Sequence, residues 1–189
     1  ELLEGSTLEQ VLGQLGTRLP LRRACRLGAQ VARIMAELHA LGLVLGGQEG
    51  GLKASNLLIE QEAQEAGGER VRLVDLSGVA PAGPAGRRVL GLPESEGGDS
   101  SVTPGGQLVD SAKRSEAPFV DASLRRRDEQ ALGELLYRML TGAPLARRVI
   151  IKGAPDPAVA LVDAARDGLS RALPDRERPI VAALEALLL

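Results

Sequence analysis

Lys53, Asn56 and Asp75 are the residues of this chain whose types and spacing could do chemistry at a shared site. Lys53 and Asn56 stand in "HALGLVLGGQEGGLKASNLLIE", which predicts a helix end, a turn through five glycines and the start of a strand. Asp75 follows the apolar run "VRLV". Hard cations prefer oxygen ligands, and phosphoryl transfer needs positioning and charge neutralisation more than covalent chemistry. Taken one at a time, these residues are a solvated loop lysine, a turn residue before a strand and a strand-end aspartate.

The chain has one cysteine, Cys25, and one histidine, His39, which excludes an internal disulfide and a metal cluster built from these residue types. Cys25 lies within a helical pattern, so we predict a packed core thiol rather than a nucleophile. His39 is expected to be a packed or exposed residue at a helix end rather than a catalytic one. A single cysteine fits a reducing compartment, and we therefore expect an intracellular, cytoplasmic protein.

Composition limits the classes of function that fit this chain. With 189 residues and 44% apolar content, the chain can bury one substantial core, as one domain or part of one. The formal charge of -2 argues against nucleic acid as a partner, because neutralising phosphates needs a basic surface. No apolar run approaches the roughly 18 residues that a membrane-spanning helix needs, and no signal-peptide layout opens the chain. The opening "ELLEG" resembles the interior of a domain, so we expect an excerpt whose upstream sequence could carry a targeting signal.

Two helices are predicted before the glycine-rich stretch. In "STLEQVLGQLG", Ser6 and Glu9 have the spacing of a capping box, and the short helix is expected to end near Gly16. In "LPLRRACRLGAQVARIMAELHALG", apolar residues recur at helical spacing and arginines occupy the opposite face. Pro20 suits its first turn and Gly42 its end. The second pattern predicts a long amphipathic helix.

The remainder predicts a mainly α chain with one small β-hairpin. "NLLIE" and "VRLVDL", separated by "QEAQEAGGER", have the pattern of two hairpin strands with a long loop. From 78 to 116 Gly, Pro and Ser dominate, and we expect a long loop that is functional or disordered. "DEQALGELLYRMLTG", "DPAVALVDAARDGLSRAL" and "RPIVAALEALL" predict three more helices, the last opened by Pro179.

In this order, the motifs resemble the C-terminal lobe of a protein kinase, and the resemblance covers essentially the whole chain, 1–189. "ELLEGSTLEQVL" resembles the hinge and the next helix, and "IMAELHALGLV" the end of the helix that leads into the catalytic loop. "LKASN" is similar to L-K-x-x-N of serine/threonine and tyrosine-kinase-like members, and "VDLSG" to the D-F-G segment. "EAPF" resembles the end of the activation segment, "RRRDEQALGELLYRMLTG" the buried helix, and "LPDRERPI" the D-P-x-x-R-P motif.

The resemblance implies an α+β kinase fold of which this chain is the C-lobe. Neither a glycine-rich nucleotide loop nor a V-A-I-K lysine occurs in the chain, so the N-lobe is expected upstream of Glu1. Segment 78–116 would be the activation segment. Asp128 would be the aspartate that accepts a hydrogen bond from the catalytic-loop backbone.

The resemblance also implies ATP and Mg²⁺ as cofactors. Asn56 and Asp75 would be the metal ligands, and Lys53 would lie near the γ-phosphate. Leu58 would lie beneath the adenine. The remaining contacts to the adenine edge would come from the hinge, through the Glu1 carbonyl and the Leu3 backbone.

The catalytic base of the family is missing. Two alignments of the catalytic loop place the base position at Gly47 or at Gly51, and glycine has no side chain that accepts a proton. General-base catalysis contributes roughly 10² to 10⁴ in rate. Glu49 lies in the insertion "QEGG" and is a poorly positioned substitute. Leu45 and Leu76 stand where the family has His and Phe of the stack that couples its lobes, although leucines can still pack.

This pattern is that of a pseudokinase: a scaffold or regulatory binding module in signalling, with protein partners, in which ATP binding is weak or lost. One alternative is a divergent, active serine/threonine protein kinase that uses Glu49 or substrate-assisted transfer of the ATP γ-phosphate to protein hydroxyls. A second alternative is a helical interaction module without any role for nucleotide. The three differ in whether ATP binds and whether its phosphate is transferred.

Overall fold

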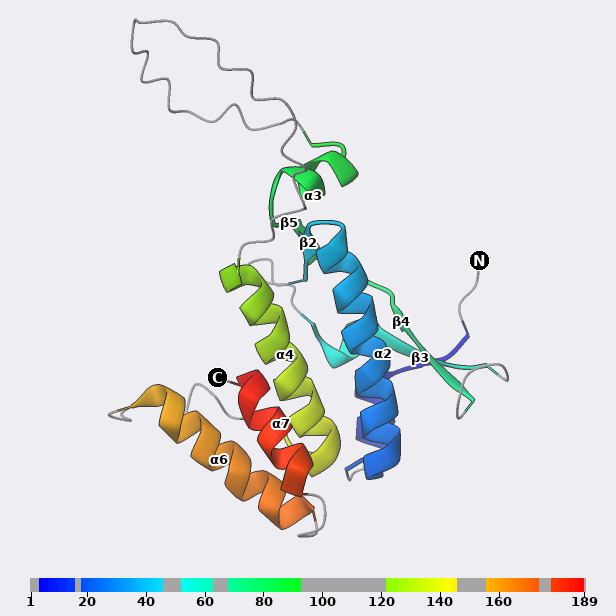
Figure 1. Ribbon diagram of the computed structural model, residues 1–189. Helices are drawn as coiled ribbons and strands as arrows, with labels where there is room; N and C mark the ends of the chain where they lie inside the picture. The colour runs from blue at the N-terminus through cyan, green and yellow to red at the C-terminus, as the bar shows by residue number, and fades with distance from the viewer. Residues whose placement is uncertain are drawn as a thin grey trace, which may run out of the picture.

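The computed structural model describes residues 4–15, 18–45, 52–62, 68–92, 122–145, 156–173 and 178–188. The chain is mainly helical with two small antiparallel sheets (Figure 1). The helices are α1 (Leu8–Leu15), α2 (Leu21–Ala40), the 3₁₀ turn η1 (Ala54–Asn56), α3 (Pro84–Val89), α4 (Ala122–Thr141), α6 (Pro157–Ala172) and α7 (Arg178–Leu188). The strands are β1 (Ser6–Thr7), β2 (Leu43–Val44), β3 (Leu57–Gln61), β4 (Glu69–Leu73) and β5 (Ala80–Pro81).

Helices α2 and α4 lie side by side and contribute more residues to the core than any other element (Figure 1). The buried stripe of α2 includes Leu27 and Val31, and α4 contributes Leu135 and Met139. Helices α6 and α7 pack beside α4. Burial of apolar side chains of this size stabilises the folded state by about 1.5–3 kcal/mol each. The predicted amphipathic helix is confirmed, with its end at Gly42, whose φ of 73° is a conformation that glycine adopts without strain.

The side chain of Cys25 corrects one prediction, because it is exposed rather than packed in the core. The apolar stripe of α2 runs through Ala24, Leu27, Gly28 and Val31. With 3.6 residues per turn, position 25 is rotated by about 100° from the centre of this stripe and lies beside it. The helical periodicity that predicted α2 therefore places this cysteine outside the core.

The start of α1 is capped one residue later than predicted. The Thr7 N–H donates to Gln10 Oε1 at 2.8 Å, and the Gln10 N–H donates to Thr7 Oγ1 at 3.2 Å. Ser6, the predicted cap, pairs with Ile59 as part of strand β1, so the backbone leaves the extended conformation only after Thr7. The capping box is therefore Thr7–Gln10 rather than Ser6–Glu9.

The predicted hairpin is confirmed as strands β3 and β4, with Leu57 opposite Leu73. Strand β1 joins the other edge of β3, which gives the strand order β1-β3-β4. A second, two-stranded sheet pairs β2 with β5 and was not predicted. Because β2 precedes the glycine-rich loop and β5 follows Asp75, this pairing brings the two segments with candidate site residues toward each other.

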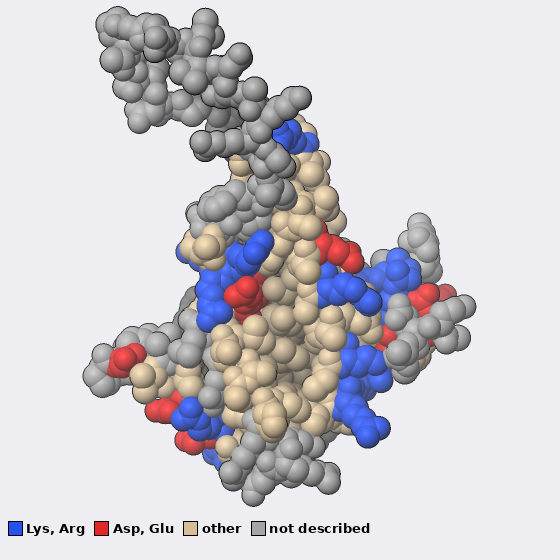
Figure 2. Space-filling view, in the orientation of Figure 1, with Lys and Arg blue, Asp and Glu red and all other residues tan. Residues whose placement is uncertain are grey.

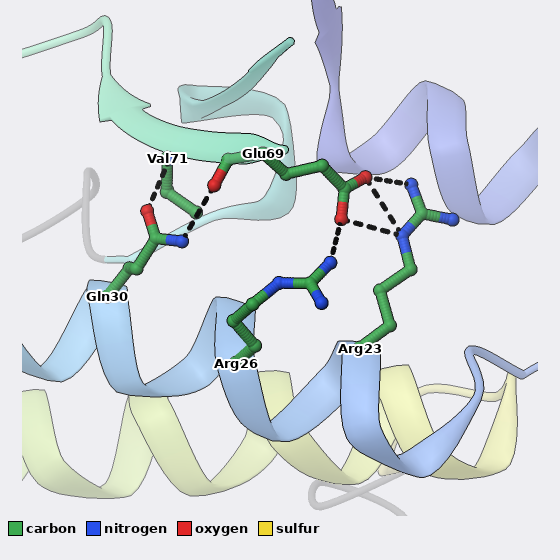
Figure 3. A network of polar contacts seen from close by, with 5 residues as sticks. All are labelled: Arg23, Arg26, Gln30, Glu69 and Val71. Atoms are coloured by element: carbon green, nitrogen blue, oxygen red, sulfur yellow. Dashed lines mark hydrogen bonds and ion pairs between the residues drawn. The ribbon is translucent and has the colours of Figure 1, made fainter. Parts of the chain in front are cut away.

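Helix α2 covers the outer edge of strand β4 through polar side chains (Figure 3). The Gln30 amide donates to the Glu69 carbonyl at 3.0 Å and accepts from the Val71 N–H at 2.8 Å, as a neighbouring strand would. The Glu69 carboxylate, 8% exposed, binds Arg23 at 2.7 Å and also Arg26. An edge strand exposes unpaired backbone groups, and α2 satisfies two of them here.

Part of the segment predicted as a long loop, 78–116, has regular structure, because it contains β5 and α3. Helix α3 approaches the end of α2 so closely that a Cβ at Gly86 would lie 2.1 Å from the Gly42 carbonyl oxygen. Residues 93–121 fall outside the described part of the chain. Among the described helices, none combines the length and the apolar character needed to cross a membrane.

Candidate functional site

Lys53 and Asn56 flank the short turn η1 at the entrance to strand β3. The Asn56 N–H donates to the Lys53 carbonyl at 3.0 Å, and Asn56 Oδ1 accepts from the Ser55 hydroxyl at 3.2 Å. The Asn56 carbonyl accepts from the Val74 N–H at 2.9 Å, which extends the hairpin ladder by one step. This hydrogen bond places Asn56 beside the residue that precedes Asp75. The structure thus brings the two candidate metal ligands to the same end of the hairpin.

Asp75 is an exposed carboxylate held in a local turn. Its Oδ1 accepts a hydrogen bond from the Ser77 N–H at 2.9 Å, the arrangement of an Asx turn. Hydrogen bonds from the Ser77 backbone and hydroxyl lower the pKa of Asp75, and attraction to Lys53 lowers this pKa further. Asp75 is therefore ionised at neutral pH, with the Lys53 ammonium as a neighbouring charge.

Asn56 and Asp75 fit a shared magnesium site in the chemistry of their donors. Both side chains offer oxygen atoms, and an amide oxygen retains a second lone pair when it accepts one hydrogen bond. Mg²⁺ commonly binds one or two protein oxygens and completes its shell with water and substrate phosphates. The described residues contain no group of three or more His, Cys, Asp or Glu side chains suited to a metal ion. A metal at Asn56 and Asp75 would thus depend on water and phosphate oxygens.

Leu58 lies on the face of the hairpin opposite to the main core. Side chains alternate along a strand, and its neighbours Leu57 and Ile59 belong to the core cluster. Leu58 is nevertheless only 9% exposed, because the segment at Gly5 packs over it. This orientation is compatible with the expected position beneath a bound base. Leu3 and Glu1, the expected hinge contacts, lie outside the described residues.

A buried carboxylate at the N-terminal part of α4 joins three parts of the chain. Asp128 is 1% exposed, and its Oδ2 accepts the Leu45 N–H at 2.9 Å and contacts His39 Nε2 at 2.8 Å. Its Oδ1 is also buried and has no hydrogen-bond partner among the described residues. Buried charged groups are costly unless hydrogen-bonded. The hydrogen bond predicted between Asp128 and the loop backbone is thus confirmed at Leu45, the last described residue before the glycine-rich loop.

His39 is packed at a helix end, as predicted. It lies in the last turn of α2, is 9% exposed and contacts Asp128. Its position four residues after Met35, on the buried stripe, was a signal that this histidine faces inward. A buried histidine needs a polar partner, and the Asp128 carboxylate provides it here. This contact is what sequence reasoning missed.

The remaining predicted site residues divide into two groups. Gly47, Gly51 and Glu49 lie outside the described residues. Leu45 is buried, as expected of a residue that packs, whereas Leu76 is 61% exposed and does not pack into the core. Leu76 therefore takes no part in a buried stack among the described residues.

Compared with known proteins, the chain matches no protein-family model and no curated protein. The chemistry of the site is accordingly inferred from its residues and their geometry. The arrangement offers one ammonium, one amide and one carboxylate at the same end of a hairpin, near a loop anchored by Asp128. Ammonium, amide and carboxylate groups are the kinds of groups that bind metal–phosphate complexes in proteins.

Proposed function

We propose that this chain is the C-terminal lobe of a protein-kinase-like domain that works as a scaffold or regulatory binding module and not as a phosphotransfer enzyme. The observation that carries the proposal is the hydrogen bond from the Leu45 N–H to the buried Asp128 carboxylate. It anchors the chain immediately before the loop in which the family has its catalytic aspartate. Both aligned base positions, Gly47 and Gly51, are glycine. A hydrogen bond that anchors the chain at Leu45 thus coexists with the loss of the proton acceptor in the loop that follows.

The pairing of short strands supports the kinase-like part of the proposal. Strand β2 leads into the glycine-rich loop and pairs with β5, which follows Asp75. The Asn56 carbonyl accepts from the Val74 N–H on the neighbouring strand. These contacts hold the segments bearing Lys53, Asn56 and Asp75 near one another, as a nucleotide-binding lobe requires.

Residual nucleotide binding would use the groups that remain. Bound ATP and Mg²⁺ would supply the phosphates and the cation whose charges the protein must balance. The Asp75 carboxylate and the Asn56 amide oxygen would hold the metal, and the Lys53 ammonium would offset phosphate charge. Leu58 would provide an apolar surface beneath the adenine. Because Asp75 is exposed in this chain, we expect this binding to be weak.

Thermal melting of the full-length protein tests nucleotide binding. Ligand at about 100 times its dissociation constant stabilises the native state by roughly 2.7 kcal/mol, which is a readable shift in Tm. We expect a shift with millimolar ATP and Mg²⁺ that disappears in Asp75→Ala. The control is Asp163→Ala, which removes an exposed carboxylate on α6 and should leave the shift unchanged.

The outcomes of this experiment separate the alternatives. A shift that Asp75→Ala leaves intact would contradict the assignment of Asp75 as a metal ligand. The absence of any shift would favour the helical interaction module without nucleotide. Transfer of phosphate to protein hydroxyls, lost in Asp75→Ala, would contradict the scaffold and establish a divergent kinase.

A further inference from the structure

A second concave site lies away from Lys53, Asn56 and Asp75. A cavity of about 480 Å³ opens between residues 4–6, α1, β3 and the start of α2. Its apolar lining comes from Val11 and Ile59, both buried, and its polar lining includes the exposed amides of Gln14 and Gln61. A volume of this size suits a small ligand or an inserted side chain, and an apolar floor with a few polar groups is typical of binding sites. Of the candidate nucleotide-site residues that the structure describes, namely Lys53, Asn56, Leu58 and Asp75, none lines it.

A stripe of arginines on α2 reaches this cavity through Arg23. Arg22, Arg23, Arg26 and Arg33 lie on one side of the helix, because 3.6 residues make a turn. Figure 2 shows Lys and Arg side chains gathered over the N-terminal half of α2, whereas acidic side chains show mainly over other parts of this face. Arg23 belongs both to the stripe and to the lining of the cavity. The cavity therefore has a basic flank on the side of α2.

Two members of the arginine stripe are held in a fixed position (Figure 3). Arg23 and Arg26 both bind the Glu69 carboxylate, and their side chains are 28% and 30% exposed. Two guanidinium groups on one carboxylate leave a net positive charge of one. Because Glu69 is itself hydrogen-bonded to Gln30 through its carbonyl, this charge is preorganised beside the cavity. Preorganised arginines are well suited to bind carboxylates.

We propose that the cavity and the arginine stripe together dock an acidic segment of a partner protein, with one aliphatic side chain inserted between Val11 and Ile59. Charge complementarity selects this occupant, since the stripe is basic while the chain as a whole carries a formal charge of -2. The exposed Glu4 lines the far side of the cavity, so the acidic residues of the segment lie toward α2. The proposal rests on the scaffolding function proposed above and names the chemistry of its partner.

The test uses fluorescein-labelled peptides of 12 residues and fluorescence anisotropy with the full-length protein. The first peptide contains Asp, Glu and Ser with one central Leu, and the second has Ser in place of that Leu. We expect the Leu peptide to bind about tenfold more tightly, because burying one leucine contributes about 1.5–3 kcal/mol. Gln61→Trp, which fills the cavity from an exposed position, is expected to abolish this difference.

Charge-reversal variants test the arginine stripe. Arg22→Glu combined with Arg33→Glu changes two exposed residues of the stripe and should weaken binding about tenfold. Arg166→Glu combined with Arg171→Glu makes the same change of net charge on the exposed surface of α6 and should leave affinity within about twofold.

Three outcomes would overturn the docking proposal. These are equal affinity for the two peptides, equal weakening in the two double variants, and binding of a nucleic-acid oligomer or anionic vesicles in place of the acidic peptides. The ATP-dependent melting shift is measured on the same samples. If ATP still shifts the Tm but the peptides do not bind, the docking proposal alone is refuted. If the peptides bind but ATP does not shift the Tm, the docking proposal stands and nucleotide binding is refuted.

Discussion

At the scale of single residues, Asp128 is the side chain on which the candidate site depends most. One oxygen of this buried carboxylate accepts the Leu45 N–H and contacts His39 Nε2. These contacts tie the end of α2 and the entrance of the glycine-rich loop to the N-terminal part of α4. Under the proposed function, this loop would lack the catalytic base, whereas the hydrogen bond from Leu45 to Asp128 at its start is present.

Replacing Asp128 tests the importance of this anchor. Asp128→Ala leaves the Leu45 N–H and His39 buried without their partner, and we expect the free energy of unfolding to fall by about 3 kcal/mol. Asp128→Asn keeps an acceptor oxygen and should cost less. The control, Asp167→Ala, removes an exposed carboxylate on α6 and should change stability by less than about 0.5 kcal/mol. Urea unfolding measures all three, and equal losses for Asp128→Ala and Asp167→Ala would contradict the anchor.

The N-cap of α1 gives a second prediction at this scale. Thr7 donates and accepts the capping hydrogen bonds with Gln10, whereas Ser6 belongs to β1. We expect Thr7→Ala to reduce the free energy of unfolding by about 1 kcal/mol and Ser6→Ala to reduce it by much less. Thermal or urea unfolding of the two variants measures these losses. A larger loss for Ser6→Ala than for Thr7→Ala would contradict the Thr7–Gln10 cap and support the Ser6–Glu9 capping box.

At the scale of elements, long-range side-chain contacts hold the helices to the sheet and to each other. Gln30 completes the edge of β4, and the Glu69 cluster adds ion pairs to the same interface. Farther away, Arg138 on α4 donates to both carboxylate oxygens of Glu9 on α1, at 2.6 and 2.7 Å. Each of these contacts joins elements that are distant in the sequence.

The Glu9–Arg138 pair predicts a pH dependence of stability. The hydrogen bonds from Arg138 lower the pKa of Glu9 from its ordinary value of 4.5. A carboxyl whose pKa is lowered by folding stabilises the protein fully above 4.5, and this stabilisation is lost as pH falls through the lowered pKa. Because the pair is largely exposed, we expect Glu9→Gln to cost only about 0.5 kcal/mol at pH 7. Urea unfolding across pH should show this difference vanish in acid, and a difference independent of pH would contradict the assignment.

Sequence reasoning predicted the elements with strong periodicity and missed those fixed by distant contacts. Helix α2 and the hairpin β3–β4 follow from apolar spacing, but β2 and β5 are two residues each and carry no periodic signal. The cap of α1 was placed one residue early because Ser6 and Thr7 are both good N-cap residues, and only the end of β1 at Thr7 decides between them. The Asp128 contact was predicted through the kinase resemblance. The contact of His39 with Asp128 was not predicted, because a single histidine gives no spacing pattern that points to a partner.

At the scale of the whole molecule, the chain presents two separate surfaces. One is the end of the hairpin with Lys53, Asn56 and Asp75, where the side chain of Leu76 is left exposed. The other is the cavity beside the arginine stripe of α2. In the proposed kinase-like lobe, which lacks a base, the first surface would serve nucleotide binding and the second would serve partner docking. This separation allows nucleotide binding and partner docking to be measured independently.

The most direct test of the central claim is a phosphotransfer assay on the full-length protein with labelled ATP, Mg²⁺ and a mixture of protein substrates. The missing general base lowers the rate by roughly 10² to 10⁴ relative to a competent site. We expect wild type to transfer no more phosphate than Asp75→Ala, which lacks the proposed metal ligand. Transfer by wild type that clearly exceeds that of Asp75→Ala would contradict the claim and show that another group replaces the lost aspartate.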